Sequence, residues 1–252
     1  MRKIKLIIAY DGRSFSGWQR QKKAASIQAA LEQGLNVLTR ENLTVHSAGR
    51  TDAGVHAEAM PVHFITSSAI PCQAFKKGLN SILPGAIRIV EADEMPGSFH
   101  ARYDALGKVY HYYFSNSETM YPMRRYYCAH APRVKNIEKM TSCLEILIGR
   151  HDFSCFEATG SRNFSSGRRG AIREIFSADI ISYNKQLNEY RFEIYGQGFL
   201  RKMVRNIMGT LFMAGRNKLS LADFKEVLLA GDRKYAGPTA PACGLFLHKV
   251  YY

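Results

Sequence analysis

The alternation of apolar and polar positions divides the first half of the chain into short strands and amphipathic helices. Residues 2–10 predict a strand that Asp11-Gly12 ends, and further strands are expected near 44–49, 60–66 and 86–92. A first helix is expected with Ser26 as its N-cap, and Pro71 opens a second. Their apolar residues recur at helical spacing: Ile27, Leu31, Leu35 and Leu38 in the first, and Phe75, Leu79 and Ile82 in the second. The resulting order, strand, helix, strand, strand, helix, strand, is that of the ferredoxin-like split motif.

The second half repeats this order of elements with one helix added. The predicted elements are a strand at 107–115, a helix from Asn136 to about Ile148, strands at 171–183 and 189–197, helices at 199–213 and 221–229, and a strand at 244–251. Ser220 and Asp223 match a capping box for the added helix. We therefore expect an α+β fold of two halves, residues 1–105 and 106–252. The halves should form a largely antiparallel sheet with helices on one side, and a ligand-binding cleft where they meet.

Charge and composition narrow the function classes. The chain has 35 Lys and Arg against 21 Asp and Glu, a net charge of +14, and a pI near 9.6. The excess is uneven, with 13 basic and 9 acidic residues in 1–105 but 22 and 12 in 106–252. Such a balance favours a nucleic-acid partner, the alternative being a basic surface that serves only solubility.

Localisation and redox chemistry follow from what the chain lacks. No apolar run approaches the roughly 18 residues that span a bilayer, and the charged start does not resemble a signal peptide, which predicts a cytoplasmic protein without a membrane partner. The five cysteines are odd in number and scattered, without zinc-ligand spacing, so we expect reduced structural thiols and no metal site.

Residues 49–57, Gly-Arg-Thr-Asp-Ala-Gly-Val-His-Ala, concentrate functional groups in a segment with almost no apolar content. The two glycines permit tight turns and close approach of the backbone to a ligand. Asp52 is the one carboxylate, flanked by Arg50, Thr51 and His56. The alternative interpretation is a polar turn between two strands.

A helix over 199–213 would place its apolar residues on one side and Arg201, Lys202 and Arg205 on the other. Arg201 and Arg205 are four residues apart and would be neighbours on that exposed face. One guanidinium there can follow an RNA phosphate, and one can pair with a carboxylate such as Asp52.

The strand at 107–115 alternates so that Tyr110, Tyr112 and Phe114 share one face. Core packing is one explanation for any of these rings. The other is a platform on which an unpaired base stacks.

Residues 153–173 have no apolar period and are rich in Gly, Ser and Arg, which predicts a long loop. Its arginines are Arg162, Arg168, Arg169 and Arg173, with Glu157 as the one acid expected to offset them. The loop either closes over a phosphate backbone or is a solvated insertion.

Several ordered motifs together resemble the tRNA pseudouridine synthases of the TruA family, nearly end to end. They are Tyr10-Asp11-Gly12, Phe15 to Gln21, Gly49 to Ala57, Asn80 to Pro84, Phe99 to Arg102, Lys108 to Tyr113, His151 to Phe153, Phe199-Leu200, Met203 to Ile207, Ala240 to Ala242 and Gly244-Leu245.

The resemblance implies the pseudouridine synthase fold with a basic cleft, and a homodimer without metal or organic cofactor. The implied reaction is isomerisation of uridine to pseudouridine in the anticodon stem and loop of tRNA, at nucleotide positions 38 to 40. On this pattern Asp52 is the catalytic nucleophile, Tyr110 stacks on the target uracil, and Arg205 is the partner of the aspartate. Arg50 would fill the space left by the extruded base or grip a phosphate, and Arg201 and Lys202 would bind RNA. His56 is expected to be structural.

Two departures from the family pattern bear on substrate fit. Ala59-Met60-Pro61 stands where the family usually has Gly-Gln-Val, and Pro61 predicts a sheet edge or a bulge. Arg173-Glu174-Ile175 stands where Arg-Thr-Ile is common. Two rival functions stay open: a non-catalytic RNA-binding protein, since split motifs and sheet-borne aromatics also describe RNA-recognition modules, and a hydrolase that releases the base, for which no paired carboxylate is evident in the sequence.

Overall fold

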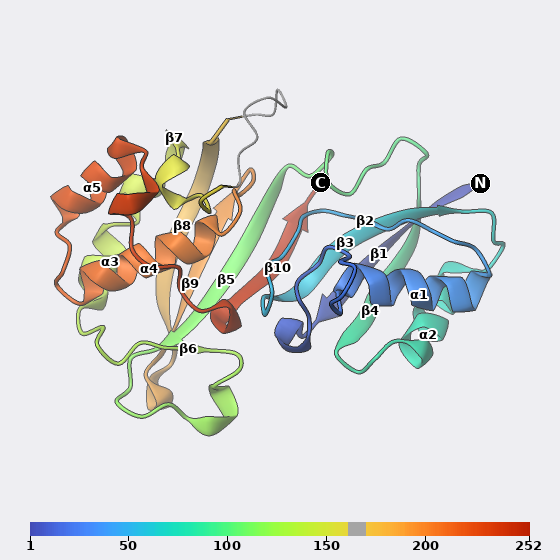
Figure 1. Cartoon of the computed structure of the whole chain (residues 1–252), viewed down its shortest axis with the longest axis horizontal. Coiled ribbons are helices and arrows are strands. Elements are labelled where there is room, and N and C mark those ends of the chain that lie inside the picture. Colours follow the sequence, from blue (N-terminus) through green and yellow to red (C-terminus); the bar gives the residue numbers. More distant parts are fainter. Residues whose placement is uncertain (161–169) are drawn as a thin grey trace. The chain divides into compact units, whose positions relative to one another are not determined.

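The computed structural model describes residues 1–160 and 170–252, and its contacts divide the chain into two compact units (Figure 1). The first unit comprises residues 1–108 and 246–252, and the second comprises residues 109–245. The sequence placed residues 106–252 together. The difference arises at the C-terminus, where the last strand joins the first unit from Phe246 onward, a pairing between distant segments that no local pattern reveals.

The first unit has the strand order of the ferredoxin-like split motif. Its elements are β1 (Arg2–Tyr10), α1 (Ile27–Thr39), β2 (His46–Ser47), β3 (His56–Thr66), α2 (Cys72–Ile82) and β4 (Ile87–Met95). The strands lie in the order β4-β1-β3 with β2 on β3, and all of these pairs are antiparallel. Strand β10 (Leu245–Tyr251) runs parallel to β3, with Phe246 opposite His56 and Leu247 opposite Ala57.

The apolar pattern explains the core of this unit. Every second residue of β1 from Ile4 onward is buried, and the Phe75 ring of α2 packs on Phe64 of β3 with 5.5 Å between ring centroids. The Ser26 side chain accepts a hydrogen bond from Ala29 N and begins α1 as predicted. Ile82 was expected in the core but is 37% exposed, because it is the last residue of α2.

Pro61 lies inside the sheet and not at its edge. It is opposite Ile7 of β1, and on the other side its carbonyl oxygen accepts a hydrogen bond from Ala48 N at 2.9 Å. The edge prediction is therefore wrong. The register with β1 does shift between Ile8 and Tyr10, just before Pro61 on the β3 side, so the irregularity that a proline favours is present.

The second unit follows the same strand order over three strands. Its elements are β5 (Gly107–Ser115), β6 (Ala129–His130), α3 (Ile137–Ser142), β7 (Gly149–Asp152), β8 (Ile172–Asn184), β9 (Glu189–Gly196), α4 (Met203–Gly215) and α5 (Leu221–Ala230). The order β5-β9-β8 continues to β7, while β6 pairs parallel with β5. The capping box is confirmed: Ser220 Oγ accepts from Asp223 N at 3.1 Å, and Ser220 N donates to Asp223 Oδ2 at 2.9 Å. The helix expected to reach Ile148 ends at Ser142, and a separate 3-10 turn follows at Glu145–Leu147.

Helix α4 begins later than the sequence predicted. Lys202 adopts a left-handed conformation with φ 61°, which interrupts helical geometry, and the helix starts at Met203. Almost every residue of α4 is buried. Its Phe212 ring packs on Tyr112 and Phe114 of β5, at 6.2 and 5.3 Å between centroids, so those two rings belong to the core.

The α+β fold with largely antiparallel sheets is thus confirmed for both units. Among the described residues, no helix is both long and apolar enough to cross a membrane.

Candidate active site

The Asp52 loop, residues 49–55, is held by the segment that follows β1. Tyr10 and Thr51 share a hydrogen bond between their hydroxyl oxygens at 2.9 Å, and Trp18 N donates to Thr51 O at 3.1 Å. Within the loop, Val55 N donates to Asp52 O at 3.2 Å. Tyr10, Trp18 and Thr51 are all buried. Contacts with neighbouring residues therefore hold the loop, which has too few apolar residues to be held by its own burial.

Two glycines allow this segment to approach the loop closely. A Cβ atom at Gly12 would lie 2.0 Å from the carbonyl oxygen of Val55. At Gly17, which has φ +95°, it would lie 2.6 Å from Thr51 O. Both neighbours are backbone atoms, so any larger residue must displace the chain on either side of Asp52.

The start of the loop is also fixed. Lys108 Nζ donates to Ala48 O at 2.8 Å, and Ser47 Oγ donates to Gly49 O at 2.7 Å. On this frame Asp52 is partly exposed and Arg50 is exposed. The loop therefore presents a carboxylate and a guanidinium to a ligand while its backbone stays bound.

His56 has the surroundings of a structural residue, as the sequence interpretation expected. Its side chain is 1% exposed, and its ring stacks on Phe246 with 4.6 Å between centroids. Gly12 N donates to His56 Nδ1 at 3.2 Å, and Asp11 Oδ1 lies 3.3 Å from the same nitrogen. These contacts tie β3 to the end of β1.

In the second unit, Tyr110 differs from the other aromatic residues on its face of β5. The residue is 9% exposed, whereas Tyr112 and Phe114 are fully buried. Phe199 packs against it edge to face, with 5.1 Å between centroids and an interplanar angle of 83°. Tyr110 is therefore slightly more exposed than the two core residues, and its ring is oriented by packing on Phe199.

Arg205 lies in the first turn of α4 and is fixed to the segment at 237–241. Its Nε donates to Ala240 O at 2.8 Å, and Ala240 N donates to Arg205 O at 3.0 Å. Gly209 makes this approach possible, because a Cβ atom there would lie 1.6 Å from Pro238 O. The guanidinium is thereby anchored at one of its nitrogens.

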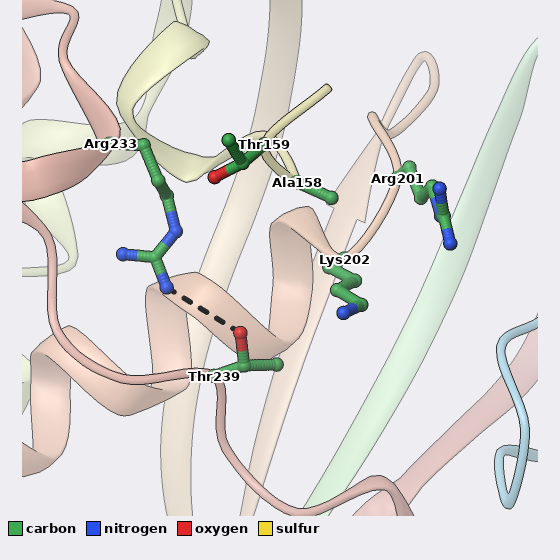
Figure 2. Close-up of a pocket in the computed structure, with 6 residues that line it drawn as sticks. All are labelled: Ala158, Thr159, Arg201, Lys202, Arg233 and Thr239. Atoms are coloured by element: carbon green, nitrogen blue, oxygen red, sulfur yellow. Dashed lines mark hydrogen bonds between the residues drawn. The ribbon is translucent and has the colours of Figure 1, made fainter. Parts of the chain in front are cut away.

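Arg201 and Lys202 were expected beside Arg205 on one exposed helix face, and that placement is wrong. Both precede α4, and they line a pocket of about 230 Å³. Figure 2 shows Arg233 and Thr239 at one side of this pocket, Lys202 and Arg201 at the other, and Ala158 and Thr159 along a third. Sequence reasoning missed Arg233 and Thr239, since each is distant in the chain and stands in an ordinary turn-like context.

The site residues predicted from sequence are divided between the two units. Arg50 and Asp52 lie in the first, and Tyr110, Arg201, Lys202 and Arg205 lie in the second. Of the arginines predicted for the loop at 153–173, Arg162, Arg168 and Arg169 lie outside the described residues, and Arg173 is in β8 opposite His151.

Comparison with known proteins decides the family. The family model described as tRNA pseudouridine synthase matches residues 6–104 and 144–252. The chain belongs to the tRNA pseudouridine synthase family. The match includes the Asp52 loop and α4, and it confirms the resemblance drawn from the motifs. The chain is accordingly an isomerase that forms pseudouridine from uridine in tRNA, and the non-catalytic alternative is not favoured.

Full-length relatives agree with this assignment. The chain is 46% identical over 253 residues to tRNA pseudouridine synthase A 1 of Desulfotalea psychrophila, with 100% of both chains covered. It is 40% identical over 252 residues to tRNA pseudouridine synthase A of Ruminiclostridium cellulolyticum, again over 100% of both. The protein of that name from Syntrophotalea carbinolica is 39% identical over 249 residues, which cover 99% of this chain and 96% of the relative.

Proposed function

We propose that Asp52 is the nucleophile of this synthase and that its target is a uridine in the anticodon stem and loop of tRNA, at nucleotide positions 38 to 40. One observation carries the assignment of the nucleophile. Asp52 is a partly exposed carboxylate on a loop whose backbone is fixed by Tyr10, Trp18 and two closely packed glycines. A rigid frame around a reactive group is what positioning for catalysis requires.

The chemistry suits a single carboxylate. The N1–C1′ bond of uridine breaks, a C5–C1′ bond forms, and the hydrogen on C5 is replaced as N1 gains a proton, so no atoms are lost overall. A nucleophile assists by adding to C6 of the base or to C1′ of the sugar and then leaving. An ionised carboxylate can follow either route, and it also stabilises positive charge that develops on the sugar.

Tyr110 and Arg205 are proposed to serve the same nucleotide. Extrusion of a base from its stack costs a few kcal/mol, and stacking on an aromatic ring returns roughly 1–3 kcal/mol. Tyr110, at 9%, is the most exposed of the three aromatic residues on its face of β5. Arg205 is proposed to keep Asp52 ionised and oriented, with Arg50 on a neighbouring phosphate or in the space left by the base.

The wider setting is proposed from charge and resemblance. The net charge of +14 suits a tRNA partner, and Arg201 and Lys202 are proposed to contact the RNA. We further propose a cytoplasmic homodimer, for which sedimentation of the purified protein is the direct test.

The test is Asp52→Asn, which keeps the size of the side chain and removes its charge. We expect pseudouridine formation in labelled tRNA to be abolished, while the Kd for tRNA stays within a few-fold, because the carboxylate performs chemistry and not phosphate binding. Asp93→Asn on the exposed part of β4 is the matched control, and it should isomerise at the wild-type rate. Full turnover by Asp52→Asn would remove Asp52 from the mechanism.

A further inference from the structure

The pocket lined by Arg201, Lys202 and Arg233 has a composition that favours an anion. Its other lining residues are Ala158, Thr159 and Thr239, so none of the six described residues around it carries a carboxylate. Three cationic side chains and two hydroxyl groups surround about 230 Å³, enough space for a phosphate group and part of an attached sugar. Figure 2 shows the Lys202 and Arg233 side chains near the hollow, whereas the Arg201 side chain points away from Arg233 at its edge. Three cationic residues at one hollow without a carboxylate favour an anionic ligand.

Arg233 is held in place by a partly buried network of hydrogen bonds. Its Nη2 donates to Asn206 Oδ1 at 3.2 Å and lies 3.5 Å from Thr239 Oγ1, and its Nη1 donates to Ala236 O at 3.1 Å. Asn206 is fully buried, accepts a second hydrogen bond from Thr239 Oγ1 at 2.6 Å, and donates to Phe156 O at 2.8 Å. Because the network orients the guanidinium before any ligand arrives, little side-chain entropy is lost on binding.

The start of α4 adds to the positive potential. Lys202 occupies the N-cap position in a left-handed conformation, and no side chain caps the helix there. The first turn of this 13-residue helix therefore begins directly beside a pocket-lining lysine, and the positive end of the helix dipole favours negative charge in the same place. Ala158 N donates to Arg201 O at 3.0 Å, which ties the two walls of the pocket together.

We infer that this pocket binds one backbone phosphate of the substrate RNA. The identity of the ligand rests on the proposed function. Arg201 and Lys202, already proposed to contact RNA, form one phosphate site together with Arg233 and Thr239. In that site Lys202 and Arg201 supply charge from the start of α4, and Arg233 supplies a guanidinium oriented by its hydrogen bonds.

The test is the salt dependence of tRNA binding by Arg201→Gln/Lys202→Gln. Loss of one phosphate contact lowers the slope of log Kd against log salt by roughly 0.7–0.9. We expect a drop of that size and a Kd weakened about fivefold or more in moderate salt. Lys218→Gln/Lys225→Gln is the matched control, since it removes two exposed charges from the same unit outside the pocket. Equal slopes for the two double variants would overturn the inference.

Arg233→Gln gives an independent readout. Phosphate-ethylation interference should show one position in the tRNA where modification blocks binding of the wild-type chain and has no effect on the variant. Circular dichroism confirms that the variant is folded, and Arg201→Gln/Lys202→Gln should lose the same position. An unchanged interference pattern in both variants would contradict the site.

Inorganic phosphate distinguishes an RNA site from a site for a free anion. We expect millimolar phosphate to compete weakly with tRNA. Tight binding of phosphate alone, with tRNA affinity insensitive to the pocket variants, would mean that the pocket takes a free anion and would refute the inference. The proposed function is tested separately, because a wild-type chain that forms no pseudouridine fails that proposal whatever the pocket variants show.

Discussion

Gly17→Ala tests whether close packing of the segment after β1 holds the Asp52 loop in its working position. Gly17 has φ +95°, a conformation that costs a residue with a Cβ atom about 1–2 kcal/mol. The added Cβ would also lie 2.6 Å from Thr51 O, whereas ordinary van der Waals contact begins at 3.4 Å. The neighbouring backbone must therefore move, and overpacking of this kind costs typically about 1–3 kcal/mol.

Together these effects predict a loss of about 2–5 kcal/mol in the free energy of unfolding. That is a large share of the roughly 5–15 kcal/mol that stabilises a typical protein. The rate should fall as well, because displacement of a catalytic group by about 1 Å can cost 100-fold. Thr51 precedes Asp52 directly, so a shift of its carbonyl is passed to the reactive side chain.

Trp18 makes the measurement direct. It is the single tryptophan of the sequence, is 2% exposed, and donates its backbone N–H to Thr51 O. Its fluorescence during urea unfolding therefore reports on the unit that holds the loop, and single-turnover formation of pseudouridine reports the rate. Gly97→Ala is the control, since no atom lies within 4 Å of its added Cβ.

The expected result is a lower urea midpoint and a rate reduced about 100-fold for Gly17→Ala, with wild-type behaviour for Gly97→Ala. Equal stability and equal rates for the two variants would refute the reasoning, because the loop would then be positioned by something other than this contact.

Three further predictions follow from the structure. Burial, with smaller effects of His100 and His46, lowers the pKa of His63 from 6.5 to about 4. The unfolded chain therefore binds this proton more readily than the folded protein, so the free energy of unfolding should fall by at most about 3 kcal/mol as the pH drops from 6.5 toward 4. A His63→Asn variant with the wild-type pH profile of unfolding would contradict this. Gly209→Ala should displace the segment at 237–241 and the anchor of Arg205, lowering the melting temperature and the rate, whereas Gly198→Ala, with nothing within 4 Å of its Cβ, should change neither. Arg205→Met should reduce the single-turnover rate about 100-fold or more with a smaller loss of tRNA affinity; an unchanged rate would show that its guanidinium takes no part in the reaction.

Local sequence determined most of the elements and the chemical group at the site. Period-two alternation determined β1 and the part of β9 from Phe192 onward, because one register alone buries their apolar faces. Ser26 and the Ser220–Asp223 box marked helix starts, since capping depends on a few neighbouring residues. Asp52, which lies between two glycines, was identified as a candidate because its segment has too few apolar residues to be held in place by its own burial.

Tertiary structure decided what depends on contacts between distant residues. The start of α4 moved to Met203 because Lys202 takes a left-handed conformation, which removed Arg201 and Lys202 from the predicted helix face. Arg233 and Thr239 both hydrogen-bond to Asn206, which is distant from each of them in the chain, and this places them at the same pocket as Arg201 and Lys202. The last strand paired with β3 in the first unit, and Gly12 and Gly17 met the Asp52 loop. Each of these features depends on contacts between residues that are distant in the chain. Such contacts produce no repeating pattern of apolar and polar residues, so the sequence alone does not predict them.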